Sequence, residues 1–97
     1  MADLRNASGE IGYFRIHDVG SGFGPPTDFI DVECVIKLRQ EPTLAFGIQL
    51  RNDVNVHVHN GMLDLIRDAY FHNRHIDIEY WVDPGKNNGR IFRLLVH

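Results

Sequence analysis

Alternation of apolar and polar residues with a period of two constrains the fold of this chain more than any other feature. Successive side chains of a β-strand point to opposite faces of a sheet, so this period indicates strands with one buried face. The alternation runs through five long segments, at residues 10–19, 29–40, 44–51, 75–83 and 90–97, and through a shorter one at residues 52–59. The chain therefore predicts a mainly β fold with five to six strands.

The same alternation assigns an inner face to each strand. In residues 10–19 a bulge at Gly12 would let Ile11 share the inner face with Phe14 and Ile16. The other side chains expected inside are Ile30, Val32, Cys34, Ile36, Leu38, Leu44, Phe46, Ile48, Leu50, Ile76, Ile78, Tyr80, Val82, Phe92, Leu94 and Val96. Asp31 and Glu33 fall on the outer, solvated face.

One segment changes the period from two to about 3.6, which is typical of an amphipathic helix. It covers residues 60–73, with Asn60 or Gly61 as the N-cap. Phe71 lies outside the apolar stripe of this helix, so we expect it to be exposed. The element order is then strand, strand, strand, helix, strand, strand.

A chain of 97 residues can build one hydrophobic core and no second one. We expect a flexible tail at residues 1–8 and a single domain at residues 9–97. No run approaches the ~20 apolar residues of a membrane span, and the first residues lack the apolar core of a secretory signal. We therefore expect a cytoplasmic protein with no membrane partner.

Cys34 is the single cysteine of the chain, which excludes an internal disulfide and a cysteine-based zinc cluster. Because it falls on the apolar side of its strand, we expect a buried, unreactive thiol.

The stretch NDVNVHVHNG, residues 52–61, places His57 and His59 two positions apart, a spacing at which both can reach one metal ion from a strand. The sequence offers no definite third ligand. The simpler interpretation is an extended run with Val54, Val56 and Val58 inside and the histidines outside, so we expect no metal and no cofactor. Near an oligomer interface, protonation of these histidines near pH ~6.5 would make assembly depend on pH.

Catalytic patterns are missing from the sequence. The glycine-rich segment GSGFGPP, residues 20–26, is followed by a strand, whereas a phosphate-binding loop needs the N-terminus of a helix. Ser21 lacks the context of a nucleophile elbow, and Asp31 with Glu33 is explained by a solvated strand face. We expect a non-enzymatic protein.

The element order, the helix between the third and fourth strands and Gly12 in the first strand together resemble the oligonucleotide/oligosaccharide-binding barrel, or OB-fold. Such barrels bind ligands on the outer face of strands two and three and with the loops after strands one and four. On this chain the resemblance places ligand-binding residues at Tyr13, Arg15, Phe23, Arg39, Arg51 and Lys86. A single-stranded nucleic acid is one candidate ligand, although the net charge of −3 opposes phosphate binding.

Size and element order are also similar to those of the B subunits of AB5-type toxins, which are OB barrels that assemble into pentameric rings and bind sugars. This resemblance implies a homo-oligomer, with an oligosaccharide as a second candidate ligand. Large apolar side chains expected on outer faces support an interface between copies, and they are Val35, Phe71, Trp81, Ile91 and Leu95. We therefore expect an OB-like binding and assembly module, with single-stranded nucleic-acid binding as the alternative.

Overall fold

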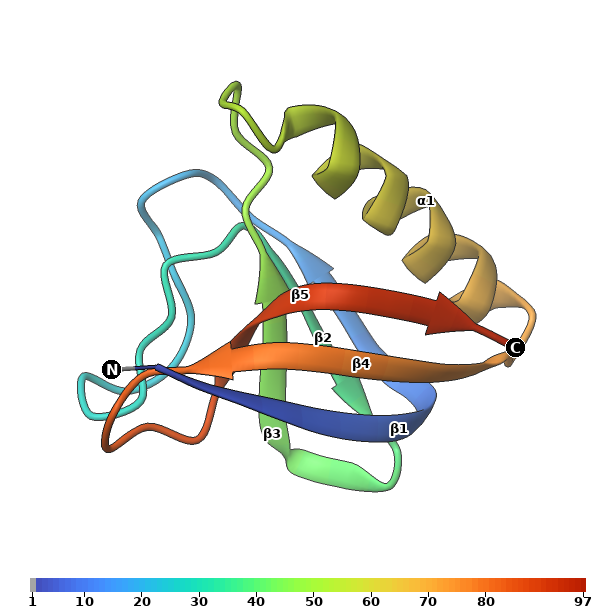
Figure 1. Cartoon of the computed structure of the whole chain (residues 1–97), viewed down its shortest axis with the longest axis horizontal. Coiled ribbons are helices and arrows are strands. Elements are labelled where there is room, and N and C mark those ends of the chain that lie inside the picture. The colour runs from blue at the N-terminus through green and yellow to red at the C-terminus, as the bar shows by residue number, and fades with distance from the viewer. Residues whose placement is uncertain (1) are drawn as a thin grey trace.

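The computed structural model describes residues 2–97, and within that range the chain forms five strands and one helix (Figure 1). In chain order these elements are β1 (Asp3–Ile16), β2 (Cys34–Leu38), β3 (Glu41–Ile48), α1 (Val56–Phe71), β4 (His75–Val82) and β5 (Gly89–Val96). The predicted mainly β fold and its order of elements are confirmed. Among the described residues, no helix is both long and apolar enough to span a membrane.

The strands close into a barrel in the order β1-β2-β3-β5-β4. Closure depends on the length of β1, whose first half pairs with β4 and whose second half pairs with β2, both antiparallel. The register between β1 and β2 shifts between Ile11 and Tyr13, so the bulge predicted at Gly12 is confirmed. A short parallel contact between β3 and β5 completes the ring.

Residues 3–8, expected to belong to a flexible tail, form the start of β1 instead. Their backbone pairs with β4, with Asp3 opposite Val82 and Ser8 opposite Asp77. Most of their side chains are exposed, so no apolar alternation marks the strand in the sequence. Met1, the first residue of the expected tail, lies outside the described residues.

The core fills the barrel with side chains from all strands and from α1. The face predicted to be inside is buried along the whole of β4, at Ile76, Ile78, Tyr80 and Val82. The Cys34 thiol is buried as well, and burial raises its pKa to about 12, which keeps it protonated and unreactive. Ile16 was predicted to be inside but is exposed, because it ends β1 at the rim of the barrel.

A bulge in β5 reverses the faces of two residues. Glu79 lies opposite Arg93 and Tyr80 lies opposite Ile91, so Phe92 is an extra residue between these pairs. Ile91 therefore turns into the core and Phe92 turns outward, the reverse of both predictions. Ile91 is not available to an oligomer interface.

The helix α1 begins within the segment that was expected to be extended. Its N-cap is Asn55, not Asn60 or Gly61, and Val54 and Val58 are exposed where they were predicted to be inside. Valines at every second position mimic a strand, while the side chains that α1 buries are spaced for a helix, at Met62, Ile66 and Ala69. These pack α1 along the side of the barrel against β1 and β5 (Figure 1).

A second apolar cluster lies outside the barrel, where the β1–β2 loop (residues 17–33) folds over the outer face of β2 and β3. Ile30 and Val32 of this loop are buried against Val35 and Ala45. Val35 does point outward, as predicted, but the loop of its own chain covers it, so it is not part of an exposed interface. Gly47 leaves the space for Val32, since a Cβ on Gly47 would lie 2.4 Å from Val32 Cγ2.

Gly47→Ala should therefore destabilise the fold by roughly 1–3 kcal/mol through overpacking. Gly61→Ala is the matched control, because a Cβ there meets nothing within 4 Å and alanine favours a helix. Urea unfolding measures both. If Gly47→Ala is less stable, adding Val32→Ala should restore part of the loss. If Gly47→Ala is as stable as the parent, the loop does not pack on β3 as described.

Candidate functional site

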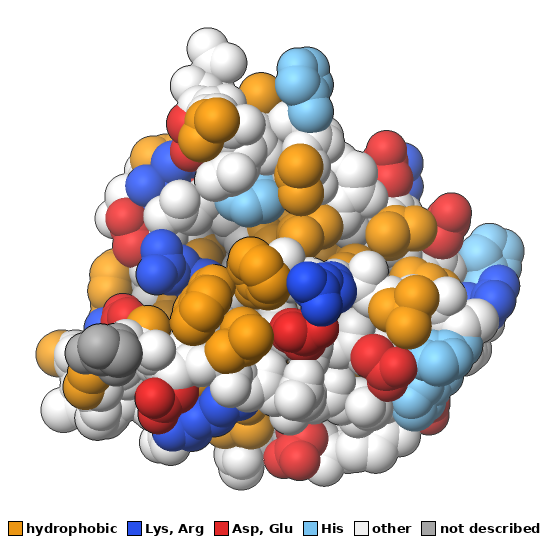
Figure 2. Space-filling model, in the orientation of Figure 1, with side chains coloured by type: hydrophobic (Ala, Val, Ile, Leu, Met, Phe, Trp, Pro, Cys, Tyr) orange, Lys and Arg blue, Asp and Glu red, His pale blue; other side chains and the backbone are white. Residues whose placement is uncertain are grey.

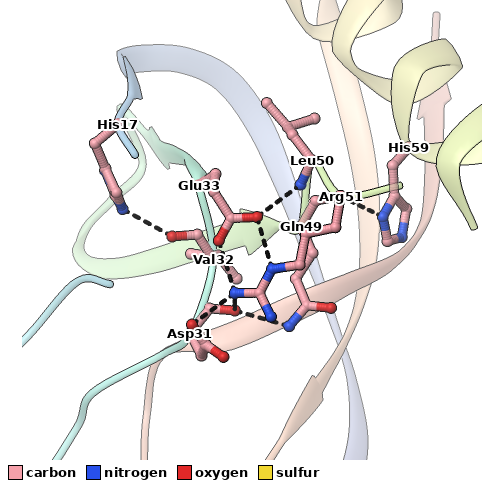
Figure 3. Close-up of polar contacts among 8 residues, drawn as sticks. All are labelled: His17, Asp31, Val32, Glu33, Gln49, Leu50, Arg51 and His59. Atoms are coloured by element: carbon pink, nitrogen blue, oxygen red, sulfur yellow. Dashed lines mark hydrogen bonds and ion pairs between the residues drawn. The ribbon is translucent and has the colours of Figure 1, made fainter. Parts of the chain in front are cut away.

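A buried carboxylate fixes the β1–β2 loop on the sheet (Figure 3). Glu33, predicted to be solvated, is only 2% exposed. Its Oε1 accepts hydrogen bonds from Arg51 Nε and from the backbone N–H of Leu50, each at 2.9 Å. Its Oε2 accepts from Arg51 Nη2 at 2.8 Å, so the guanidinium holds the carboxylate with two parallel bonds.

The same guanidinium reaches a second residue of the loop. Arg51 Nη2 donates to Asp31 Oδ1 at 2.7 Å, and this hydrogen bond holds the pKa of the Asp31 carboxyl below its usual range. Arg51, one of the predicted ligand-binding residues, thus joins the end of β3 to the loop. Burying Glu33 would be costly without this cation.

Two histidines take part in the same framework (Figure 3). His17 Nε2 donates to the carbonyl of Val32 at 2.7 Å, and His59 Nδ1 donates to the carbonyl of Gln49. His59 thus ties the first turn of α1 to the end of β3, while His57 is exposed. His57 and His59, the two histidines that suggested a metal motif, are therefore not placed to bind one ion together.

Three of the predicted ligand-binding residues come together on the outer face beside the loop. The rings of Tyr13 and Phe23 pack edge to face with their centroids 6.4 Å apart. Lys37 Nζ lies 5.0 Å from the Tyr13 ring centroid, and the Arg15 guanidinium lies 5.6 Å from that of Phe23. We call Tyr13, Arg15, Phe23 and Lys37 the aromatic–cation cluster, because its cations lie over aromatic faces.

The remaining predicted ligand-binding residues are held elsewhere. Arg39 Nη2 donates to Asn73 Oδ1 at 2.8 Å, beyond the end of α1. Lys86 Nζ donates to the carbonyl of Phe29 at 2.6 Å, which ties the β4–β5 loop (residues 83–88) to the β1–β2 loop.

Further bonds join these two loops to each other and to the sheet. Asp28 Oδ1 accepts from the backbone N–H groups of Asn87 and Asn88, and Asn88 Oδ1 accepts from the N–H of Ala45. The part of the outer face of β2 and β3 that holds Val35, Ala45 and Gly47 is therefore covered by the chain itself.

Exposed apolar side chains gather instead on the outside of β1, β4 and β5. Leu4 is 43% exposed, Trp81 36%, Phe92 46% and Leu95 53%. Leu4 lies opposite Trp81 in the ladder, and the rings of Trp81 and Phe92 pack edge to face at 5.6 Å. Figure 2 shows apolar side chains grouped on this side of the barrel. We call these four residues the apolar surface.

The apolar surface agrees only in part with the predicted interface. Trp81 and Leu95 belong to it, but Phe71, although exposed, lies at the end of α1 that leads into the start of β4, away from Trp81. The sequence did not indicate Leu4, because the start of β1 carries no alternation, or Phe92, because the bulge in β5 reversed its face.

A cavity of about 430 Å³ adjoins this surface between the start of α1 and strands β3 and β5. Trp81, Phe92 and Arg90 line it from the sheet, and Asn55 and His59 line it from the helix end. An indole ring beside amide, imidazole and guanidinium groups can hold a small polar ligand.

A group of possible metal ligands lies at the other end of β4, where the ligand atoms of His75, Asp77 and His97 are within 4.8 Å of one another. The sequence did not indicate this group, because His75 and Asp77 lie on β4 and His97 follows β5, and the alternation does not give the register between these strands. Searches of protein-family models, curated proteins and solved structures found no match for this chain.

Arg51→Met should destabilise the fold by roughly 3 kcal/mol, because it leaves the Glu33 charge buried without its partner. Arg67→Met is the control, since it removes an exposed pair with Asp64 that contributes less than ~1 kcal/mol. Denaturant unfolding at neutral pH measures both. The double variant Glu33→Gln with Arg51→Met should recover part of the loss, and equal effects of the two single variants would contradict this account.

Proposed function

We propose that this protein is a non-enzymatic assembly module whose copies associate through the apolar surface. The observation that carries the proposal is the set of large apolar side chains, 36–53% exposed, on three neighbouring strands. Contiguous apolar patches on a folded domain mark interaction sites. Trp and Phe are also among the residues enriched at the centres of protein interfaces.

A second copy of the chain is the occupant that suits the charges of this surface. Arg93 Nη1 and Glu79 Oε1 form a pair at 2.6 Å on the same outer face, between Trp81 and the level of Leu95. Both signs of charge thus border the same apolar patch. A surface with both signs can match a copy of itself by exchanging pair partners, whereas a partner of one sign would meet repulsion.

The OB-fold resemblance extends this proposal. The helix between β3 and β4 and the bulge at Gly12 are features on which the resemblance rests, and a closed barrel is what it implies. The similarity to the B subunits of AB5-type toxins implies a closed ring, with five copies as the ring size. An oligosaccharide is the ligand that this similarity implies, and the cavity beside Trp81 is the place where we propose that it binds.

Single-stranded nucleic-acid binding is the second candidate, and the aromatic–cation cluster favours it. Aromatic rings that stack bases and cations that contact phosphates are the means by which OB barrels bind single strands. In this cluster Lys37 and Arg15 lie over the rings of Tyr13 and Phe23, so the ring faces are partly occupied. The net charge of −3 further weakens phosphate binding, and we rank this candidate second.

Light scattering coupled to size-exclusion chromatography tests the assembly. The parent should elute as a multiple of 11.2 kDa, and the double variant Trp81→Glu with Phe92→Glu should elute at or near 11.2 kDa, because charge on the apolar surface opposes its burial. Val54→Glu is the control, since this exposed valine lies outside the apolar surface. A parent that stays at 11.2 kDa at high concentration would rule out the proposal.

Titration with a short fluorescent single-stranded oligonucleotide at two salt concentrations tests the second candidate. We expect weak binding that Phe23→Ala changes little. Tight binding that falls steeply with salt and is lost on Phe23→Ala and Lys37→Gln would instead establish nucleic-acid binding at the aromatic–cation cluster.

A further inference from the structure

Four polar side chains meet on the outside of the barrel where β1, β4 and β5 run side by side. Glu10 of β1 lies opposite His75 of β4 in the ladder. On the other edge of β4, the backbone N–H of His97 donates to the carbonyl of His75 at 2.9 Å. Asp77 lies two residues after His75 and so shares its face of the sheet.

The ligand atoms of this group lie close enough together for one ion to reach all three. His97 Nε2 donates a hydrogen bond to Asp77 Oδ2 at 2.7 Å, and His75 Nε2 lies 3.5 Å from Asp77 Oδ1. The three residues offer ligand atoms that all lie within 4.8 Å of one another. Tetrahedral zinc with bonds of about 2.0–2.1 Å keeps its ligand atoms about 3.3–3.5 Å apart, so small side-chain rotations suffice.

The orientation of His75 is set by a carboxylate that is not itself one of the three ligands. His75 Nδ1 donates to Glu10 Oε2 at 3.1 Å, and the other ring nitrogen, Nε2, faces Asp77. Gln40 in turn donates from Nε2 to Glu10 Oε1 at 3.0 Å. A histidine that binds a metal commonly donates its other N–H to a carboxylate that fixes the ring, and this chain of contacts has that form.

Both carboxylates of the group keep their charge. A hydrogen bond from Gln40, followed by one from His75, holds the pKa of the Glu10 carboxyl below its usual range. Hydrogen bonds from His97 and Ser8 lower the pKa of Asp77 in the same way.

We propose that His75 Nε2, Asp77 and His97 Nε2 bind a divalent transition metal ion, with Glu10 as the positioning residue. Two imidazoles and one carboxylate suit zinc best among the common divalent ions, whereas calcium and magnesium prefer oxygen ligands alone. The three side chains are about half exposed, which leaves a fourth position open to water or to a donor from a bound ligand.

The site would connect β4 to the residue that follows β5, beyond the last backbone pair of the ladder. It lies at the opposite end of β4 from Trp81 and needs no second copy of the chain. The site adjoins the apolar surface only at Leu95, which lies opposite Asp77 in the ladder, and all three ligands come from one copy of the chain.

Isothermal titration of the chelator-treated chain, expressed without a histidine tag, with zinc chloride tests the site. We expect saturation at one zinc per chain. His75→Ala and His97→Ala should each weaken binding at least tenfold, because each removes a ligand. His57→Ala is the matched control, since this exposed histidine lies on α1 outside the group and its removal should leave binding unchanged. The absence of saturable binding, or an equal loss in His57→Ala, would overturn the proposal.

Nuclear magnetic resonance of the histidine rings gives a second measurement on the unmodified chain. Zinc should shift the ring signals of His75 and His97 and leave those of His57 and His72 in place. Before zinc is added, the nitrogen shifts of His75 should show a proton on Nδ1, and Glu10→Ala should lose this preference while Glu10→Gln keeps most of it. Equal shifts at all surface histidines would show binding without a built site and would refute the proposal.

Discussion

The ion pair between Glu33 and Arg51 is the interaction on which the surface of this protein depends. A carboxylate that is 2% exposed is held by a guanidinium at the end of β3, and together they fix the β1–β2 loop across β2 and β3. The loop then buries Val32 against Gly47 and closes the face that OB barrels use for ligands. Large apolar side chains are exposed instead on the outer face of β1, β4 and β5.

Because β1 is long, it contributes residues to three different surface groups of the barrel. Its start places Leu4 beside Trp81 on the apolar surface, its middle places Glu10 beside His75, and its end places Tyr13 in the aromatic–cation cluster. The bulge at Gly12 lets this one strand pair with both β4 and β2, so that its residues belong to all three of these groups. A change in this strand therefore alters the fold and its surfaces together.

The sequence predicted the parts of the fold that depend on burial. The inner face of β4 was correct because Ile76, Ile78, Tyr80 and Val82 fall at every second position and meet the core. The predictions failed where backbone pairing or a distant partner decides the outcome. Residues 3–8 form a strand through main-chain bonds that no side-chain pattern reveals. Phe92 turns outward because of a bulge, and Glu33 is buried because Arg51, remote in sequence, neutralises it. The candidate surfaces combine residues from several strands, and the alternation does not show which residues of neighbouring strands lie opposite each other.

The central claim is that the outer face of β1, β4 and β5 is where copies of the chain meet. Trp81 lies on that face and is the single tryptophan of the sequence, so its fluorescence reports on the face alone. The most direct measurement is the emission maximum of Trp81, with its quenching by acrylamide, across a dilution series. The account predicts a shift to shorter wavelength and weaker quenching as concentration rises. Emission and quenching that stay constant while the mass of the particle increases would place the interface elsewhere and contradict it.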